Sequence, residues 1–289
     1  MERRFGVELE FSGQNVNIGT MRTHLNAAVQ EHDPNHQVSD MESFRLWTLK
    51  GEHCGMEITT PVFEANQSTF DIIHDIVDYL RRQLHGNRMI RRDCGLHVHV
   101  DIQEFTTSQI RMLCKVFHSF EGALIQLQPH SRRENSYCAR LNRFDTNWIN
   151  QFNPDNPEQR YNRDGSFIYD HSSGLNFGRF SDRGTIEIRY AAGTIRGIKV
   201  IGWIRTLLML IEISKSIEPT TELSQTESVD DLKDFIRAND TGCKWLERLK
   251  TRCCRWNTSR HQEINSPQPR RRRANSNTPL SEGEVVTSS

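Results

Sequence analysis

Ionisable residues recur two positions apart in this chain. In Cys94–Asp101 (CGLHVHVD), His97, His99 and Asp101 alternate with apolar residues. This alternation predicts a half-buried strand on which the three polar side chains share one face. For this strand alone, a pair of hydrogen-bonded histidines in a polar seam explains the pattern as well as a ligand site does.

Three further segments have the same alternation. They are Phe5–Phe11, Gly55–Thr60 and Thr185–Tyr190, which contribute Glu8 and Glu10, Glu57, and Glu187 and Arg189 respectively. Buried carboxylates that lie side by side repel one another and take up protons unless a cation compensates them. Carboxylate oxygens suit Mg²⁺ or Mn²⁺, and Mn²⁺ also accepts histidine. The segments together indicate a divalent-metal site on a sheet; the alternative is a set of unrelated surface strands.

Amphipathic helices and paired strands are predicted around these segments. The helices are Thr20–Gln30, Ser68–Leu84 with Ser68 as its cap, a helix from a Thr106–Gln109 capping box to Leu127, the nearly all-apolar Ile198–Ile213, Val229–Arg237 and Cys243–Leu249. The strand pairs are Arg45–Lys50 with Gly55–Pro61, around Gly51–His53, and Ser173–Phe180 with Arg183–Ala191, around Ser181–Gly184. This order predicts an α+β fold with a mostly antiparallel sheet backed by amphipathic helices.

Composition excludes several classes of protein. The net charge is zero and the pI is about 7.2, so the whole chain has no general attraction to nucleic acid or membranes. No stretch of about 18 residues is apolar, and Met1–Arg4 leads directly into the first strand, so we expect a cytoplasmic protein without a membrane segment. The seven irregularly spaced cysteines indicate a reducing compartment. Cys94 is either a small buried residue or a catalytic thiol.

Two segments lack apolar periodicity. His130–Ser172 is rich in arginine and aromatic residues, and its guanidinium groups suit carboxylates or phosphates, although solvated charge is the alternative. From Asn257 the chain is rich in Ser, Asn, Pro, Glu and Thr. We therefore expect a catalytic domain at 1–256 and a disordered tail at 257–289. Nucleic acid is expected to bind, if at all, only through Arg270–Arg273 in that tail.

The order of the motifs resembles that of the putative amidoligase family. The motifs are the E-x-E strand, G-M-E-I-T-T-P, C-G-L-H-V-H-V, an L-N strand, and T-I-E-I-R followed by A-G-T, and they span roughly residues 4–215. The resemblance implies a fold related to glutamine synthetase and glutamate–cysteine ligase, with the site on a concave sheet face. It also implies ATP-dependent, ADP-forming amide synthesis through an acyl phosphate. ATP and two or more Mg²⁺ or Mn²⁺ ions would be the cofactors, and a small-molecule or peptide carboxylate and an amine would be the substrates.

The resemblance also implies roles for individual residues. Matching positions make Glu8, Glu10, Glu57, His97 and Glu187 the metal ligands. His99 and Arg189 would lie near the phosphates. Ser131–Asn142 (SRRENSYCARLN) resembles another family motif, which makes Arg132 and Arg140 contacts for phosphate or substrate. Arg189, His99 and Arg140 are the expected catalytic residues.

The chain departs from the family pattern at two places. Many relatives have a D-G-S turn where this chain has Lys50-Gly51-Glu52, and an R-Y pair where it has His171–Gly174 before the L-N strand. Both departures concern the donor pocket more than the metal site. A P-loop is absent, which argues against a P-loop kinase or ATPase. The remaining alternatives are a metal-dependent hydrolase or nuclease that needs no nucleotide, and a degenerate module that only binds metal or nucleotide.

Truncation after residue 256 tests the predicted domain boundary. Because 257–289 has no apolar periodicity, its removal should leave the melting temperature and nucleotide binding nearly unchanged. A truncated protein that fails to fold, or that loses nucleotide affinity, would show that the boundary is misplaced.

Overall fold

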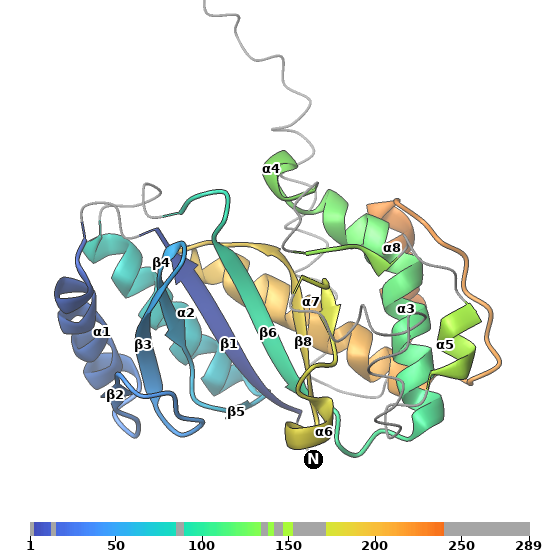
Figure 1. Cartoon of the computed structure of the whole chain (residues 1–289), viewed down its shortest axis with the longest axis horizontal. Helices are drawn as coiled ribbons and strands as arrows, with labels where there is room; N and C mark the ends of the chain where they lie inside the picture. The colour runs from blue at the N-terminus through green and yellow to red at the C-terminus, as the bar shows by residue number, and fades with distance from the viewer. Residues whose placement is uncertain are drawn as a thin grey trace, which may run out of the picture.

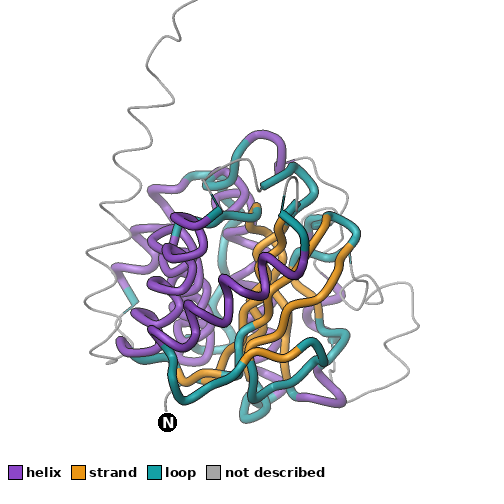
Figure 2. The backbone as a smooth tube through the Cα atoms, turned by 90° about the vertical axis from the view of Figure 1, so that its left-hand side faces the viewer, coloured by secondary structure: helices purple, strands orange, loops and turns teal. Residues whose placement is uncertain are grey.

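The protein is described by a computed structural model that covers residues 3–12, 16–84, 90–133, 138–141, 147–152 and 172–239. The predicted helix at 243–249 and the predicted tail at 257–289 lie outside these residues. Within the described part, eight strands form one sheet, and the long helices lie against one of its faces (Figures 1 and 2). No helix in this part of the chain is long and apolar enough to cross a membrane.

The sheet is mostly antiparallel. Its order is β2-β3-β4-β1-β6-β8-β7, and β5 also pairs with β1. The strands are β1 Arg4–Phe11, β2 Val38–Ser39, β3 Trp47–Glu52, β4 Gly55–Thr59, β5 Phe63–Glu64, β6 Gly95–Asp101, β7 Leu175–Asn176 and β8 Thr185–Ala192. Of the pairings among the described strands, β2 with β3 is parallel and the others are antiparallel. The predicted α+β class with a mostly antiparallel sheet is confirmed.

Four long helices back the sheet. The four are α1 Ile18–His32, α2 Gln67–Gln83, α3 Thr107–Gln126 and α7 Gly197–Ser216, and the shorter helices are α4 His130–Arg133, α5 Asn147–Gln151, α6 Phe180–Arg183 and α8 Val229–Ala238. Neighbour contacts place the four in the order α1, α2, α7, α3, and in Figure 2 they form a layer beside the strands. The nearly all-apolar α7 is buried around most of its circumference, as its sequence predicts.

The alternation in β1 explains how the sheet separates its two faces. Phe5, Val7, Leu9 and Phe11 are buried in the hydrophobic core. The residues between them, including Glu8 and Glu10, are less buried and point to the opposite face. One sequence pattern therefore supplies both the core and the polar face.

Two local predictions, a helix cap and a turn, differ from the structure. The side chain of Asn66, rather than Ser68, caps α2 by accepting a hydrogen bond from the Thr69 amide. The predicted turn before β8 is the short helix α6, which ends at Gly184 in the left-handed conformation with φ 66°. This helical turn separates β8 from β7, which is only two residues long.

A buried carboxylate joins the helix layer to the sheet. Glu121 of α3 is fully buried and accepts hydrogen bonds from the Tyr190 hydroxyl (2.8 Å) and the Leu141 amide (2.7 Å). Burial and the Glu121 carboxylate hold the pKa of Tyr190 well above its ordinary value, so the phenol stays protonated and donates. Glu121 thereby fixes the segment 138–141 beside β8.

Tyr190→Phe should destabilise the protein by about 1–3 kcal/mol, because it leaves the buried Glu121 with one hydrogen bond fewer. Urea denaturation followed by circular dichroism measures this change in the free energy of unfolding. Tyr79→Phe on α2 is the matched control and should shift it by less than about 0.5 kcal/mol. Equal effects of the two substitutions would show that the Glu121 bond contributes little.

Candidate active site and metal centre

The strand register places the predicted metal ligands on one face. Glu8 lies opposite His97, Glu10 lies opposite Glu57, and Glu187 lies opposite His99. Directly paired residues of antiparallel strands project their side chains to the same side. The sheet thus gathers side chains from β1, β4, β6 and β8 on the face opposite the helices.

Three of these residues form a compact cluster. Ligand atoms of Glu8, His97 and Glu187 all lie within 4.8 Å of one another. The Nδ1 atom of His97 is 2.9 Å from Glu8 Oε2 and 3.5 Å from Glu187 Oε1. His97 is only 2% exposed, so its ring is held in place by the surrounding structure. Two carboxylates and one imidazole are a donor set that fits Mg²⁺ or Mn²⁺.

The second histidine adds positive charge to this cluster. His99 Nε2 is 2.9 Å from Glu8 Oε1 and 3.9 Å from Glu187 Oε1. Burial disfavours the charged forms of both Glu8 and His99, but their mutual attraction outweighs it. The pKa of Glu8 is therefore well below its ordinary value and the pKa of His99 is above its own. The cluster requires positive charge, and the His99 imidazole supplies part of it.

Glu10 and Glu57 share the face but have other partners. Glu10 accepts a hydrogen bond from the Gly95 amide and lies 3.7 Å from His97 Nε2, the far side of the ring. Glu57 Oε1 lies 3.0 Å from Lys50 Nζ. Burial and the Glu8 carboxylate raise the pKa of Glu57 to about 8 despite Lys50. Although burial opposes it, Glu57 holds the pKa of Lys50 above its ordinary range.

Arg189 and Asn176 hold the Glu187 carboxylate. Arg189 forms an ion pair with Glu187 Oε1, and Asn176 Nδ2 donates to Glu187 Oε2 at 3.1 Å. Asn176 lies opposite Glu187 in the β7–β8 pair. The sequence offered only an L-N strand as a signal for Asn176, and its role depends on that cross-strand register.

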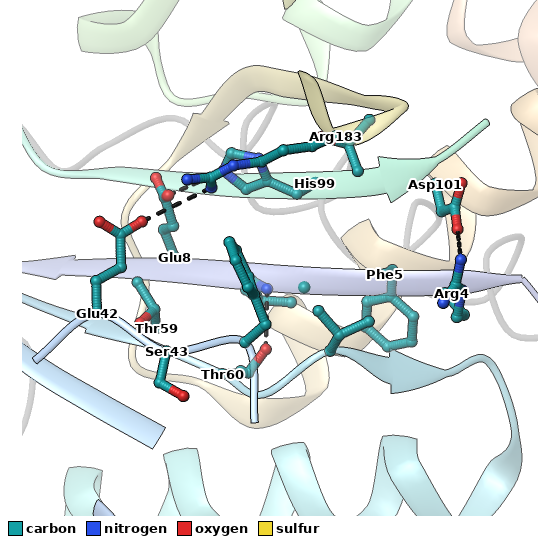
Figure 3. A pocket seen from close by; sticks show the side chains of 15 residues that line it. Arg4, Phe5, Glu8, Glu42, Ser43, Thr59, Thr60, His99, Asp101 and Arg183 are labelled. Atoms are coloured by element: carbon teal, nitrogen blue, oxygen red, sulfur yellow. Dashed lines mark hydrogen bonds and ion pairs between the residues drawn. The ribbon is translucent and has the colours of Figure 1, made fainter. Parts of the chain in front are cut away.

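Two pockets flank the cluster. We call the larger the Phe44 pocket; it has a volume of about 420 Å³, and its lining includes Phe44, Arg183, Asp101, Glu8 and His99. Figure 3 shows Glu8 and His99 in this pocket, with the side chains of Arg183 and Glu42 directed toward each other.

The smaller, or Arg132, pocket has a volume of about 170 Å³. It is lined by Glu10, Glu52, His53, Cys54, Asp93, His97, Arg132 and Arg189. Because Glu8 of the Phe44 pocket bonds to His97 of the Arg132 pocket, the cluster lies between the two.

Arg132 is a buried cation in the smaller pocket. It is 2% exposed, and its Nη2 donates to the Arg189 carbonyl oxygen at 3.0 Å. Its Nε and Nη1, and the Nε of Arg189, are buried without a hydrogen-bond partner among the described residues. Burial lowers the pKa of Arg132. Buried donors of this kind are costly to leave unpaired, so the pocket suits an anionic group.

Arg140 is not brought to the cluster. Its Nη2 donates to the Arg133 carbonyl oxygen at 3.3 Å, and its Nη1 lies 4.0 Å from Glu227 Oε1. Its catalytic and phosphate-binding roles stay predictions, because its described contacts lie elsewhere. Burial raises the pKa of the Cys94 thiol, which fits a small buried residue better than a nucleophile.

Gly95→Ala tests whether the position of His97 controls metal binding. An alanine Cβ here would collide with His97 Nε2, the far end of a side chain, so the ring must move while the backbone remains. We expect Mn²⁺ affinity to fall roughly 10- to 100-fold. Calorimetric titration measures the affinity, and circular dichroism monitors the fold.

Gly51→Ala on β3 is the matched control, because a Cβ there has no neighbour within 4 Å. Its Mn²⁺ affinity should match that of the unaltered protein. A folded Gly95→Ala protein with unchanged affinity would contradict the assignment of His97 as a ligand.

Comparison with known proteins identifies the family. The family model described as putative amidoligase enzyme matches residues 26–211, more than half of the chain. The match begins after β1, so Glu8 and Glu10 lie outside it. A search of curated protein sequences gave no match.

A similar solved structure is titled "GmaS/ADP complex-Conformation 1". It is 11% identical and covers 93% of this chain and 71% of that chain, with a TM-score of 0.42. This TM-score is too low to establish a common fold. The family match is sufficient by itself: the chain belongs to the putative amidoligase family.

Proposed function

We propose that this protein is an ATP-dependent ligase that joins a carboxylate to an amine, releases ADP and proceeds through an acyl phosphate. One observation carries the proposal: the Glu8–His97–Glu187 cluster lies beside Arg189 in a chain of the amidoligase family. The carboxylates can bind divalent cations, and the guanidinium groups can bind anionic ligands at the same time.

Glu8, His97 and Glu187 are the residues that would hold a divalent ion. Their oxygen and imidazole donors fit Mg²⁺ or Mn²⁺, and the net negative charge of Glu8 and Glu187 favours such a cation. When bound, the ion would neutralise phosphate charge and orient the γ-phosphate.

The Phe44 pocket is the proposed nucleotide site. The Arg183 guanidinium lies 4.5 Å from the centroid of the Phe44 ring; the residue Phe44 is 54% exposed, so its ring offers a flat surface to a base. Glu8 and His99 line the same pocket, so phosphates extending from a base at Phe44 would approach the cluster. The raised pKa of His99 makes it a donor to a phosphate oxygen.

The Arg132 pocket is the proposed site of the carboxylate donor. The guanidinium nitrogens of Arg132 and Arg189 that have no partner in the described part of the chain would bind the carboxylate. Glu10 and Asp93 line the same pocket and favour a substrate that also carries an ammonium group. A small amino acid or a peptide end combines both charges and fits a pocket of about 170 Å³.

The reaction that we propose between the two pockets has two steps. A donor carboxylate oxygen attacks the γ-phosphorus, the bond to the ADP oxygen breaks, and an acyl phosphate forms. The amine nitrogen then attacks the acyl carbon, phosphate leaves with the bonding electrons, and the nitrogen loses a proton to solvent. Arg189, held by Glu187, would stabilise negative charge on the transferred phosphoryl group.

The direct test is a screen of carboxylates and amines with ATP and Mg²⁺, followed by ADP release. A productive pair should give equal amounts of ADP, phosphate and a product whose mass equals donor plus acceptor minus water. Turnover that continues without nucleotide would instead indicate a hydrolase or nuclease.

Arg189→Lys should leave ATP binding intact and reduce turnover. Lysine keeps the charge but lacks the planar pair of donors. We expect a loss of about 2–4 kcal/mol of transition-state stabilisation, or roughly a thirty- to thousandfold lower rate. Calorimetric ATP binding and the rate of ADP release measure the two effects separately.

The matched control is Arg81→Lys on α2, where Arg81 pairs with Asp78 in the helix layer. Its turnover should equal that of the unaltered protein. Full turnover by Arg189→Lys would remove Arg189 from the phosphoryl-transfer step.

A further inference from the structure

The structure places a cation, Lys50, beside the acidic side chains predicted to bind metal. It lies opposite Glu57 in the β3–β4 pair, and its Nζ is 3.0 Å from Glu57 Oε1 and 3.5 Å from Glu52 Oε1. Glu57 is only 4% exposed, so its carboxylate has little access to the charge screening of solvent. The ammonium therefore supplies a positive charge directly beside this buried carboxyl group.

Of the four carboxylates predicted to bind metal, two belong to the cluster and two lie outside it. Glu8 and Glu187 converge with His97, whereas Glu10 and Glu57 do not join the group of ligand atoms within 4.8 Å. Glu10 is held by the Gly95 amide and faces the other nitrogen of His97. A single divalent ion at the cluster would thus leave Glu57 without a metal ion, and Lys50 lies beside it.

We infer that Lys50 is a built-in counter-ion that replaces a second divalent ion, so that the chain binds one ion, at Glu8, His97 and Glu187. This inference deepens the proposed function by defining its metal requirement. It also differs from the two or more ions that the sequence resemblance implies. The Lys50-Gly51-Glu52 segment is the place where the chain departs from the D-G-S turn of many relatives.

The physical reason lies in charge and tethering. An ammonium 3.0 Å from Glu57 Oε1 repels an incoming divalent cation and occupies the space beside the carboxylate oxygen that the cation would need. Because Lys50 is part of the chain, its binding to Glu57 carries no cost of immobilising a free ion. A chelator can remove a bound metal ion but cannot remove this charge.

Mn²⁺ titration of the full chain without nucleotide or substrate tests the inference. Calorimetry gives the number of bound ions, and the electron paramagnetic resonance signal of free Mn²⁺ gives an independent count. We expect one ion per unaltered chain and one for Lys50→Arg, which keeps the charge. Lys50→Gln should bind two, because Glu57 and Glu52 are released to accept a cation.

A second substitution identifies where the additional ion binds. Adding Glu57→Gln to Lys50→Gln should return the count to one, whereas Glu187→Gln should weaken the site of the unaltered chain. If Lys50→Gln does not fold, Lys50→Met, which keeps much of the apolar stem, serves the same purpose. Thermal melts of each variant establish that it is folded.

Three results would overturn the inference. They are two ions, or none, bound to the unaltered chain, and a single ion bound to folded Lys50→Gln and Lys50→Met. The ion count requires no turnover, so it is independent of ADP release. Failure of the ligase assay would not change the ion count. A count other than one would not contradict the ligase assignment, which has its own test.

Discussion

Like-charge repulsion between carboxylates is the constraint on which the rest of this site depends. The sheet sets Glu8, Glu187, Glu10 and Glu57 on one face, and Glu57 and Glu187 are buried. Such a face is stable only when cationic or hydrogen-bonding partners are interleaved with the acids. The histidines, Arg189 and Lys50 are those partners. Their contacts give the acidic face a fixed geometry even before any ligand binds.

Strand register is the means by which the fold meets this constraint. A slip of one residue in β1 would turn Glu8 and Glu10 toward the helix layer and expose Phe5 and Leu9. The hydrophobic core and the acidic face are therefore specified by the same alternation, and neither can change without the other.

The sequence predicts the strands and the side chains on each of their faces better than it predicts which strands pair and which side chains are in contact. Period-two alternation identified β1, β4, β6 and β8, and the Thr106–Gln109 capping box identified the start of α3. Which strands pair is not encoded locally, so the partner of Lys50 and the role of Asn176 emerge only from register. Arginines in an aperiodic segment give still less information. Arg132 and Arg140 look alike in sequence, yet only Arg132 lines a pocket beside the cluster.

The sequence separation of these strands makes the cluster a late product of folding. Glu8 and His97 are 89 residues apart, and Glu187 comes from β8 near the end of the sheet. Contacts across such long loops form slowly, because the loop-closure entropy is lost before they stabilise the chain. A nascent chain that has not yet extended beyond β8 lacks a ligand of the cluster altogether. Metal affinity should therefore appear during synthesis only once the last of these strands has left the ribosome.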